Sequence, residues 1–320
     1  MSNILVVGCG QLGSRHLQSL CTLESSHQLL ALEPSDQSWE ACQKVLANDA
    51  PKVSRVDGYK NLPPKIDLAI IATSADIRPK IVTNLLSQCH VSSLVLEKVL
   101  CQSVADLHTI DETINRHKTK AWVNCPRRMF PFYQELKASL GSERHIAMSF
   151  TGRDWGMGCN SIHMMDLCAY LAGSQGVESI TGQLYPEILE TKRSGFKEVH
   201  GSLRIEYDHH TSLSLSCDPH SSESPPLLTI QTEDRAWFIR EAEGFCQVQD
   251  KQSGFIQDCA YEGAYQSQLT GPLAEEILAT GSCQLTSLAE SLWLHRPFLD
   301  FMAHEFSVLD HKYQGFAPIT

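Results

Sequence analysis

Residues 2–20, SNILVVGCGQLGSRHLQSL, decide the fold of the N-terminal part of this chain. The apolar run ILVV is typical of a strand. It ends in the spacing Gly8-x-Gly10-x-x-Gly13, and a helical pattern follows directly. Gly8 permits a tight turn, Gly10 lets the backbone approach a pyrophosphate, and Gly13 lets helix and strand pack closely. The helix that begins near Gln11 and Leu12 offers unpaired N–H groups to phosphate oxygens. The stretch predicts a dinucleotide site.

An acidic residue stands at the distance from the glycines that such a site requires. Glu33 lies twenty residues past Gly13, directly after the apolar run QLLAL. A carboxylate at this point binds the ribose hydroxyls of the adenosine and disfavours a 2′-phosphate. We therefore predict NAD as the cofactor. Arg15, which could lie near the phosphates, keeps NADP as the alternative, and a glycine turn in a fold that binds no nucleotide is the second alternative.

Alternating strand and helix patterns fill residues 1–123. Short apolar runs indicate strands, and helical patterns separate them, so we expect right-handed crossovers and a doubly wound parallel sheet of the Rossmann type. The strands are expected at 4–7, 28–32, 67–73, 93–98 and 120–124, and the helices at 12–22, 35–47, 78–90 and 103–117.

The pattern changes after Pro126. Helices are expected at 127–140, 159–172, 262–279 and 286–303, and closely spaced strands at 202–208, 211–217, 227–232, 236–241 and 244–250. Short turns between strands indicate antiparallel pairing. We predict an α/β protein of two domains, in which residues 124–320 form a second α/β domain with an open, mostly antiparallel sheet.

Composition narrows the class of partner. The 320 residues carry a formal net charge of −11, which repels nucleic acid and anionic membranes. The twelve cysteines form neither C-x-x-C pairs nor zinc-like clusters. The chain starts on a strand and shows no signal peptide, and no apolar run reaches the roughly 20 residues of a membrane span. We expect a cytoplasmic protein with reduced thiols and no metal.

Polar residues follow two of the expected strands. In sheets of this type the ligand lies beyond the carboxyl ends of the strands. Thr73 and Ser74 follow DLAIIA, and Glu97 with Lys98 ends SLVLEK, so we expect all four in the cofactor groove. If these residues have only structural roles, Thr73 is expected to cap a helix and Lys98 to form a surface ion pair.

A second polar pair lies on the apolar helical segment 159–172. His163 and Asp166 are three residues apart and therefore share a helix face. A histidine of near-neutral pKa can take the hydroxyl proton while a hydride leaves an alcohol carbon, and an adjacent carboxylate can orient it. The alternative is a buried His–Asp hydrogen bond that only stabilises the domain. The residues alone favour that alternative slightly.

Three motifs in order give the whole chain a family resemblance. GCGQLGSRH (8–16), EKVL (97–100) and HMMD (163–166) resemble the glucose-fructose oxidoreductase / inositol dehydrogenase / rhizopine-catabolism (Gfo/Idh/MocA) family of NAD(P)-dependent oxidoreductases. The resemblance implies a Rossmann domain followed by a domain whose open sheet mediates homo-oligomerisation. It also implies a substrate-binding role for Lys98 and an acid/base role for His163 with Asp166.

Two positions depart from the family pattern. Val99 replaces the usual proline after Lys98, which puts the local backbone geometry in question. Cys159 stands where many members have an aspartate, with Asn160 beside it, which puts the polyol contacts in question. Asn160 remains a candidate substrate contact.

Further substrate contacts are expected near the start of the second domain. Arg127 and Arg128 can bind an anionic group, although ordinary surface charge explains them equally well. Asp154 and Trp155 lead into the helix that carries His163 and are expected to shape the pocket.

These expectations combine into one main hypothesis for the function. The resemblance implies reversible hydride transfer between a nicotinamide cofactor and a secondary alcohol or ketone of a small sugar, sugar acid or nucleotide sugar. A weaker resemblance points to bacterial surface-polysaccharide biosynthesis. The alternatives are a non-catalytic NAD-binding sensor or assembly subunit on the same fold, and a reductase of a non-sugar carbonyl.

Overall fold

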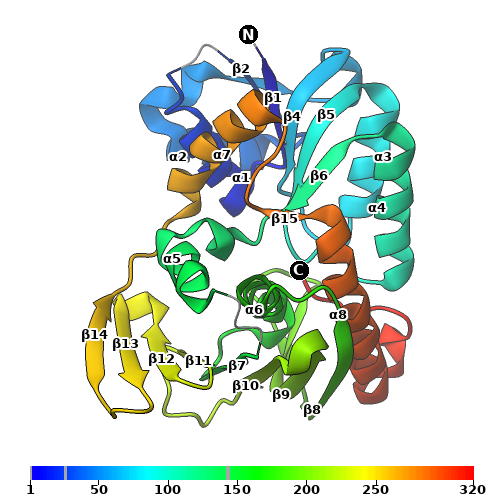
Figure 1. The fold of residues 1–320 in the computed structure, drawn as a ribbon. Helices are drawn as coiled ribbons and strands as arrows, with labels where there is room; N and C mark the ends of the chain where they lie inside the picture. The colour runs from blue at the N-terminus through cyan, green and yellow to red at the C-terminus, as the bar shows by residue number, and fades with distance from the viewer. Residues whose placement is uncertain (1, 25–26, 142–144) are drawn as a thin grey trace. The chain divides into compact units, whose positions relative to one another are not determined.

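The structure is a computed structural model that describes residues 2–24, 27–141 and 145–320. The described chain divides into two compact units (Figure 1). Unit 1 comprises residues 1–101, 105–126 and 264–288, and unit 2 comprises residues 102–104, 127–263 and 289–320. Unit 1 thus includes residues 264–288, which lie far beyond the sequence-based boundary at 123/124.

Unit 1 is built on a seven-stranded sheet in the order β15-β6-β5-β4-β1-β2-β3. Six strands are parallel, and β15 pairs antiparallel with β6. Figure 1 shows α1, α2 and α7 on one face of the sheet and α3 and α4 on the other. The elements are β1 (Asn3–Val7), α1 (Gln11–Leu20), β2 (Gln28–Leu32), α2 (Asp36–Leu46), β3 (Val53–Val56), β4 (Lys65–Ile71), α3 (Arg78–Gln88), β5 (His90–Leu96), α4 (Val104–His117), β6 (Lys120–Val123), α7 (Gln266–Thr280) and β15 (Thr286–Ser287).

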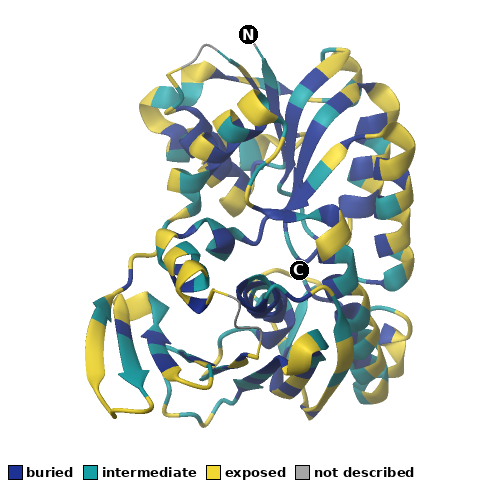
Figure 2. Ribbon diagram, in the orientation of Figure 1, coloured by how far each residue is buried: buried dark blue, intermediate teal, exposed yellow. Residues whose placement is uncertain are grey.

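Burial explains why the central strands of this sheet are apolar throughout. Helices cover both faces, so both sets of alternating side chains lie in the core. Ile4, Val6, Leu68 and Ile70 are all fully buried, and the central strands are dark along most of their length in Figure 2. The five strands expected from the sequence are confirmed. Two strands of this sheet were missed. The four residues of β3, VSRV, are too short and polar to indicate a strand, and the two residues of β15 fall at the start of the helix expected at 286–303.

Unit 2 contains an eight-stranded sheet in the order β14-β13-β12-β11-β7-β10-β9-β8. All neighbours are antiparallel except β7 and β10. The helix α6 packs on β9 and β10, and α5 packs on α6. The elements are α5 (Pro131–Leu140), β7 (Ala147–Gly152), α6 (Met157–Ala172), β8 (Val177–Glu190), β9 (Lys197–Tyr207), β10 (Ser212–Cys217), β11 (Leu227–Gln231), β12 (Arg235–Arg240), β13 (Phe245–Asp250), β14 (Ile256–Ala260) and α8 (Leu288–Leu309).

The two faces of this second sheet differ in chemistry. One row across the strands, Ile205–Leu213–Met148–Ile230–Trp237, is buried under the helices. The neighbouring row on the opposite face reads Arg204–Ser214–Ser149–Thr229–Phe238 and is polar up to Phe238. This alternation is what one covered face requires. The predicted fold class, a doubly wound parallel sheet plus an open, mostly antiparallel sheet, is confirmed.

The described residues also form six 3₁₀ helices and one disulfide, and the disulfide corrects an expectation. The 3₁₀ helices are Ala47–Lys52, Tyr59–Asn61, Pro126–Met129, Asp208–His210, Glu241–Glu243 and His311–Tyr313. Cys246 on β13 and Cys259 on β14 lie directly opposite each other and form a disulfide. The other ten cysteines are free thiols. The expectation that all thiols are reduced is wrong for this pair, because their strand register was invisible in the sequence.

Candidate functional site

The glycine loop has the geometry that its spacing predicts. Gly8 adopts φ +87°, a left-handed conformation that suits glycine. A Cβ on Gly13 would lie 1.8 Å from the carbonyl oxygen of Gly8, so only glycine permits the close contact of α1 with β1. A Cβ on Gly10 would meet nothing within 4 Å. That side of the loop is therefore open to a ligand, next to the exposed Gln11 and Leu12.

Glu33 lies against the glycine loop. Its Oε2 accepts the N–H of Cys9 at 2.8 Å, and its Oε1 accepts the N–H of Ser35 at 2.9 Å. The carboxylate is buried and fixes the loop to the end of β2. Since a carboxylate oxygen accepts more than one hydrogen bond, this role is compatible with ribose binding.

A cavity of about 450 Å³ opens beside Glu33 within unit 1. It contains the predicted residues Gly8, Glu33 and Thr73, and its remaining walls are mostly apolar. Such a cavity suits a planar base with a ribose at its polar end. The lining residues that sequence reasoning missed are Val7, Leu32, Pro34, Asp57, Gly58, Tyr59, Ile77, Lys80, Ile81 and Asn84. Residues 57–59 follow β3, and because this strand was not predicted, they were not recognised as candidates for the site.

Arg15 lies on the other side of the glycine loop. It lines a separate cavity of about 400 Å³ between the first turns of α1 and α2, together with Gly10, Gln11 and Ser38. Its guanidinium donates to the side-chain oxygen of Gln18 at 2.9 Å and is exposed. Arg15 is absent from the lining of the 450 Å³ cavity that holds Glu33.

The remaining predicted residues of unit 1 follow neighbouring parallel strands. Gly8 follows β1, Thr73 follows β4 and Lys98 follows β5, and these three strands are adjacent in the sheet. Their carboxyl ends share one edge of the sheet, so the glycine loop, Thr73 and Ser74, and Lys98 lie along that edge. The helix α3 begins at Arg78 with Ile77 as its N-cap residue, so Thr73 is not the helix cap.

Arg78, which the sequence reading missed, joins two of these strand ends. Its buried guanidinium donates to the carbonyl oxygens of Thr73, Val99 and Leu100, the last at 3.0 Å. The peptide bond between Lys98 and Val99 is cis. Nothing in the sequence around Arg78 indicates that its side chain contacts the backbone that follows another strand.

Glu97 is buried rather than open to the groove. It is 4% exposed, and its Oε1 accepts hydrogen bonds from His16 Nε2 at 2.9 Å and from Asn124 Nδ2 at 2.6 Å. Burial opposes ionisation of this carboxyl, but the hydrogen bonds and the charges of His16 and Lys98 outweigh burial and lower its pKa. The carboxylate therefore has partners within unit 1, whereas the sequence reading assigned it to the cofactor.

His163 and Asp166 lie on α6 in unit 2, as predicted. His163 is partly exposed, whereas Asp166 is 1% exposed. Both carboxylate oxygens of Asp166 accept hydrogen bonds from Arg128, at 2.9 Å from Nε and 2.8 Å from Nη2. Arg128 also lies 5.2 Å from the ring centroid of Tyr170. Asp166 thus binds a buried arginine, and its predicted role of orienting His163 stays a prediction.

Arg127 also has a carboxylate partner. Its Nε donates to Glu241 at 2.9 Å and 3.2 Å, and Tyr133 and Tyr261 donate to the same carboxylate at 2.6 Å and 3.1 Å. Burial opposes ionisation of Glu241, but the charge and hydrogen bonds of Arg127 and the two tyrosines lower its pKa. Both arginines proposed as anion ligands therefore bind acidic side chains of their own unit.

The start of α6 gathers the other predicted substrate residues. The carboxylate of Glu198 on β9 accepts the N–H groups of Gly158 and Cys159 at 2.7 Å and 2.9 Å, and so caps the helix. Just before it, Asp154 pairs with His200 at 2.8 Å. Trp155 donates to the carbonyl of Ser216, and Asn160 donates to the carbonyl of Trp155. Asp154 is exposed, and Trp155 and Asn160 are partly exposed. Glu198 lies about forty residues away in sequence, so no local motif indicated it.

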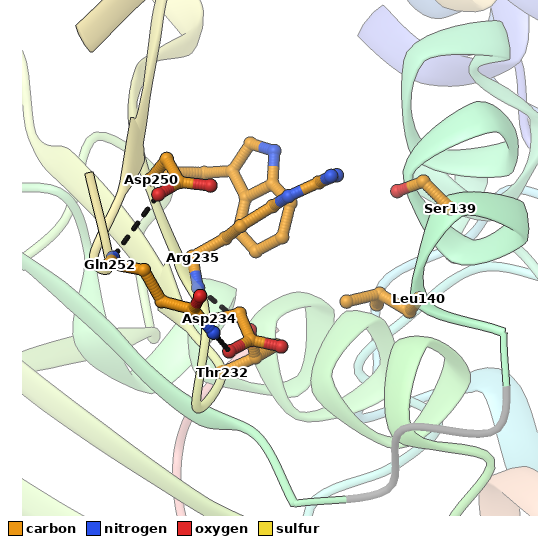
Figure 3. A pocket seen from close by; sticks show the side chains of 8 residues that line it. Ser139, Leu140, Thr232, Asp234, Arg235, Asp250 and Gln252 are labelled. Carbon is orange, nitrogen blue, oxygen red and sulfur yellow. Dashed lines mark hydrogen bonds between the residues drawn. The ribbon is translucent and has the colours of Figure 1, made fainter. Parts of the chain in front are cut away.

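A cavity of about 560 Å³ in unit 2 lies between the end of α5 and two turns of the sheet (Figure 3). Asp250 accepts backbone N–H groups of Gln252 and Ser253, and Asp234 accepts the side-chain amide of Gln252 at 2.9 Å. These two carboxylates therefore stabilise the turns by accepting hydrogen bonds within them. None of the sequence-predicted residues lines this cavity.

The described residues contain neither a candidate membrane span nor a cluster of metal-binding side chains. Among residues 2–24, 27–141 and 145–320, no helix combines the length and apolarity of a membrane span. The same residues hold no group of three or more His, Cys, Asp or Glu placed to bind a metal ion.

Comparison with solved structures shows that the fold of both units recurs together. An oxidoreductase from Agrobacterium radiobacter, solved with NAD+, L-tartaric acid and magnesium, is 12% identical (TM-score 0.71, 93% of this chain and 94% of that one). UDP-N-acetylglucosamine 3-dehydrogenase GnnA from Acidithiobacillus ferrooxidans is 13% identical (0.72, 97% and 99%). A super-repressor mutant of Gal80p from Saccharomyces cerevisiae is 13% identical (0.75, 96% and 96%).

Sequence comparison identifies the N-terminal part. No curated protein matches the chain. Residues 2–125 match the model of the GFO_IDH_MocA oxidoreductase family, described as having an NAD-binding Rossmann fold. This range contains the glycine loop, Glu33 and Lys98, and it covers the parallel sheet except β15. Residues 2–125 therefore form an NAD-binding Rossmann domain of the Gfo/Idh/MocA oxidoreductase family.

Proposed function

We propose that the chain catalyses hydride transfer between a nicotinamide cofactor and a secondary alcohol or ketone of a sugar, sugar acid or nucleotide sugar. One observation carries the proposal. The glycine loop, Thr73 and Lys98 follow three adjacent parallel strands and therefore lie along one edge of the sheet. A lysine there lies beside the groove where such folds bind a dinucleotide.

The residues of unit 1 fit NAD. The open side of Gly10 and the start of α1 suit the pyrophosphate, and the cavity beside Glu33 suits the adenosine. When bound, NAD supplies the hydride acceptor or donor. We propose that Gly8, Gly10, Gln11, Leu12 and Gly13, with Glu33, Thr73 and Ser74, hold it. Glu97 is not included in this set, because its carboxylate binds His16 and Asn124.

The remaining chemistry falls to two side chains. The Lys98 ammonium is proposed to bind the reacting oxygen of the substrate and stabilise the negative charge that develops there. His163 is proposed to accept the hydroxyl proton during oxidation and return it during reduction. Asp166 is proposed to fix α6 through Arg128. Asp154, Trp155 and Asn160, at the exposed start of α6, are proposed to contact the substrate.

A sugar-like substrate has one specific support. GnnA, whose name states that it oxidises a nucleotide sugar, shares the fold over 97% of this chain.

The family resemblance also leads us to propose a homo-oligomer that forms through the open face of the sheet in unit 2. The polar row on this face favours a hydrated rather than an apolar interface.

A panel of sugars, sugar acids and nucleotide sugars tests the proposal, with NADH absorbance as the readout. We expect Lys98→Met and His163→Asn to bind NAD like the wild-type protein, measured by calorimetry, and to lose turnover by roughly 100-fold or more. His108→Asn and Lys44→Met, at exposed positions, are the matched controls. Unchanged turnover in both site variants would contradict the proposed roles.

A second candidate is an NAD-binding protein without catalysis. The super-repressor mutant of Gal80p shares the fold over 96% of this chain, and its name describes a repressor. Val99 and Cys159 also depart from the family motifs. This candidate predicts tight NAD binding, no turnover across the panel, and NAD affinity that does not change on loss of Lys98 or His163.

A further inference from the structure

A buried histidine lies in unit 1 that neither the glycine motif nor the proposed chemistry uses. His16 sits on α1, three residues beyond Gly13, and is 0% exposed. Its Nε2 lies 2.9 Å from Glu97 Oε1, and its Nδ1 lies 2.8 Å from Thr270 Oγ1 on α7. A buried imidazole that is bonded at both nitrogens is held in a single orientation.

The partners of His16 extend this pair into a network. Asn124, which follows β6, donates to Glu97 at 2.6 Å and to the side-chain oxygen of Gln266 at 2.9 Å. Gln266 donates to Thr270 at 2.9 Å. The contacts thus connect the helix of the glycine loop, the ends of β5 and β6, and α7, which comes from a distant part of the sequence.

The network bears directly on Lys98. Glu97 precedes Lys98 in the chain, so fixing the Glu97 side chain fixes the backbone from which the lysine extends. Arg78 holds the other side by donating to the carbonyls of Val99 and Leu100. The strand end is therefore fastened both before and after Lys98. A reacting group held this way loses much of its rate when its support moves by about 1 Å.

The two bonds of His16 are not equivalent in this respect. The bond to Glu97 reaches the strand end with Lys98 directly, whereas the bond to Thr270 reaches it only through Gln266 and Asn124. Charge strengthens the first, because hydrogen bonds to an ionised carboxylate in a buried setting are stronger than neutral ones.

We propose that His16 is a positioning residue for Lys98, acting through its Nε2 contact with Glu97, while its contact with Thr270 serves packing. The proposal rests on the proposed function in so far as Lys98 acts on the substrate. It adds a part of the sequence, the helix after the glycines, to the machinery that orients the lysine.

Matched amides separate the two contacts. In His16→Gln the side-chain amide nitrogen can replace Nε2, so the bond to Glu97 is kept and the bond to Thr270 is lost. In His16→Asn the amide nitrogen can replace Nδ1, so the reverse holds. Thr270→Val removes the Thr270 contact while leaving His16 and Glu97 in place.

Two measurements are made on the full-length chain. The first is steady-state kinetics with NAD and the best substrate of the panel. We expect His16→Asn to lower kcat by roughly 10- to 100-fold with an unchanged KM for NAD, and His16→Gln and Thr270→Val to stay near wild type. The second is hydrogen exchange. We expect the amides of residues 97–101 to exchange faster in His16→Asn than in Thr270→Val.

The outcomes separate this proposal from the proposed function. Equal losses of kcat in His16→Asn and His16→Gln, or a lower Tm with unchanged kcat in His16→Asn, would overturn the positioning role. If the wild-type protein shows no turnover, the proposed function fails. The exchange of residues 97–101 then still decides whether the Nε2 contact of His16 orders that strand end, and unchanged exchange in His16→Asn overturns the inference.

Discussion

The buried pair of Arg128 and Asp166 allows a quantitative test of unit 2. The side chains are 8% and 1% exposed, and two hydrogen bonds of 2.9 and 2.8 Å join them. A hydrogen bond to a charged group contributes about 1.5–3 kcal/mol, and removing one partner of a buried pair costs about 3–5 kcal/mol. We expect Arg128→Ala to lower the free energy of unfolding by about 4 kcal/mol.

Asp166→Asn should cost less. Its amide oxygen can still accept one hydrogen bond, and Glu290, 3.6 Å from Arg128, offers the freed guanidinium a half-exposed carboxylate. We expect a loss of about 2–3 kcal/mol for this variant. The double variant Arg128→Ala/Asp166→Asn removes both charges, so it should be more stable than the sum of the two single losses predicts.

Urea unfolding at neutral pH, followed by tryptophan fluorescence, measures these free energies. A loss of 4 kcal/mol corresponds to a Tm lower by roughly 8–16 °C. Calorimetric NAD binding is the control, because the NAD-binding domain belongs to unit 1 and should be unaffected. A loss below about 1 kcal/mol for Arg128→Ala, or strict additivity in the double variant, would refute the assignment of this pair as a buried structural contact.

Three further predictions follow from other contacts. Gly13→Ala should destabilise unit 1 because its Cβ meets the Gly8 carbonyl, whereas Gly10→Ala should keep the Tm and weaken NAD binding in calorimetry, and equal Tm values would contradict this. Glu241 has a lowered pKa, so its stabilisation is present above the ordinary value of 4.5 and is lost as the pH falls below it. Glu241→Gln should therefore be less stable at neutral pH but lose less on acidification in pH-dependent thermal melts, and parallel curves would count against it. Cys246→Ser opens a loop of 13 residues and should cost about 3 kcal/mol in urea unfolding, and alkylation of all twelve cysteines without prior reduction would disprove the disulfide.

Much of the fold was predictable because its signals are local. The glycine spacing and the apolar runs of β1, β2, β4, β5 and β6 follow from a few neighbouring residues each. The inner strand β7 was also missed, because only Met148, Phe150 and Gly152 of its six residues are buried. The strands β3, β8, β14 and β15 escaped because they are short or lie at sheet edges, where exposed positions remove the apolar signal. Edge strands pair on one side only, so their residues need not be buried.

The candidate site divides in the same way. Residues placed by strand ends and helix spacing, such as Lys98 and His163, could be named from the sequence. Their partners could not, because they come from distant elements: Arg128 reaches Asp166, Glu198 caps α6, and Thr270 contacts His16. A single sequence carries no record of contacts across more than a hundred residues, such as the 254 between His16 and Thr270.

The return of residues 264–288 to unit 1 affects the order in which the chain is made. The parallel strands of unit 1 are complete once residue 123 has been synthesised, but α7, which packs on α1, and β15, which pairs with β6, come about 160 residues later. At ribosomal rates of about 5–20 residues per second, this delay is on the order of 10–30 s. During that interval the face of α1 that α7 later covers, with His16 and Ser19 within it, stays without its partner. The NAD-binding unit is therefore finished only after residues 127–263 of unit 2 have been translated.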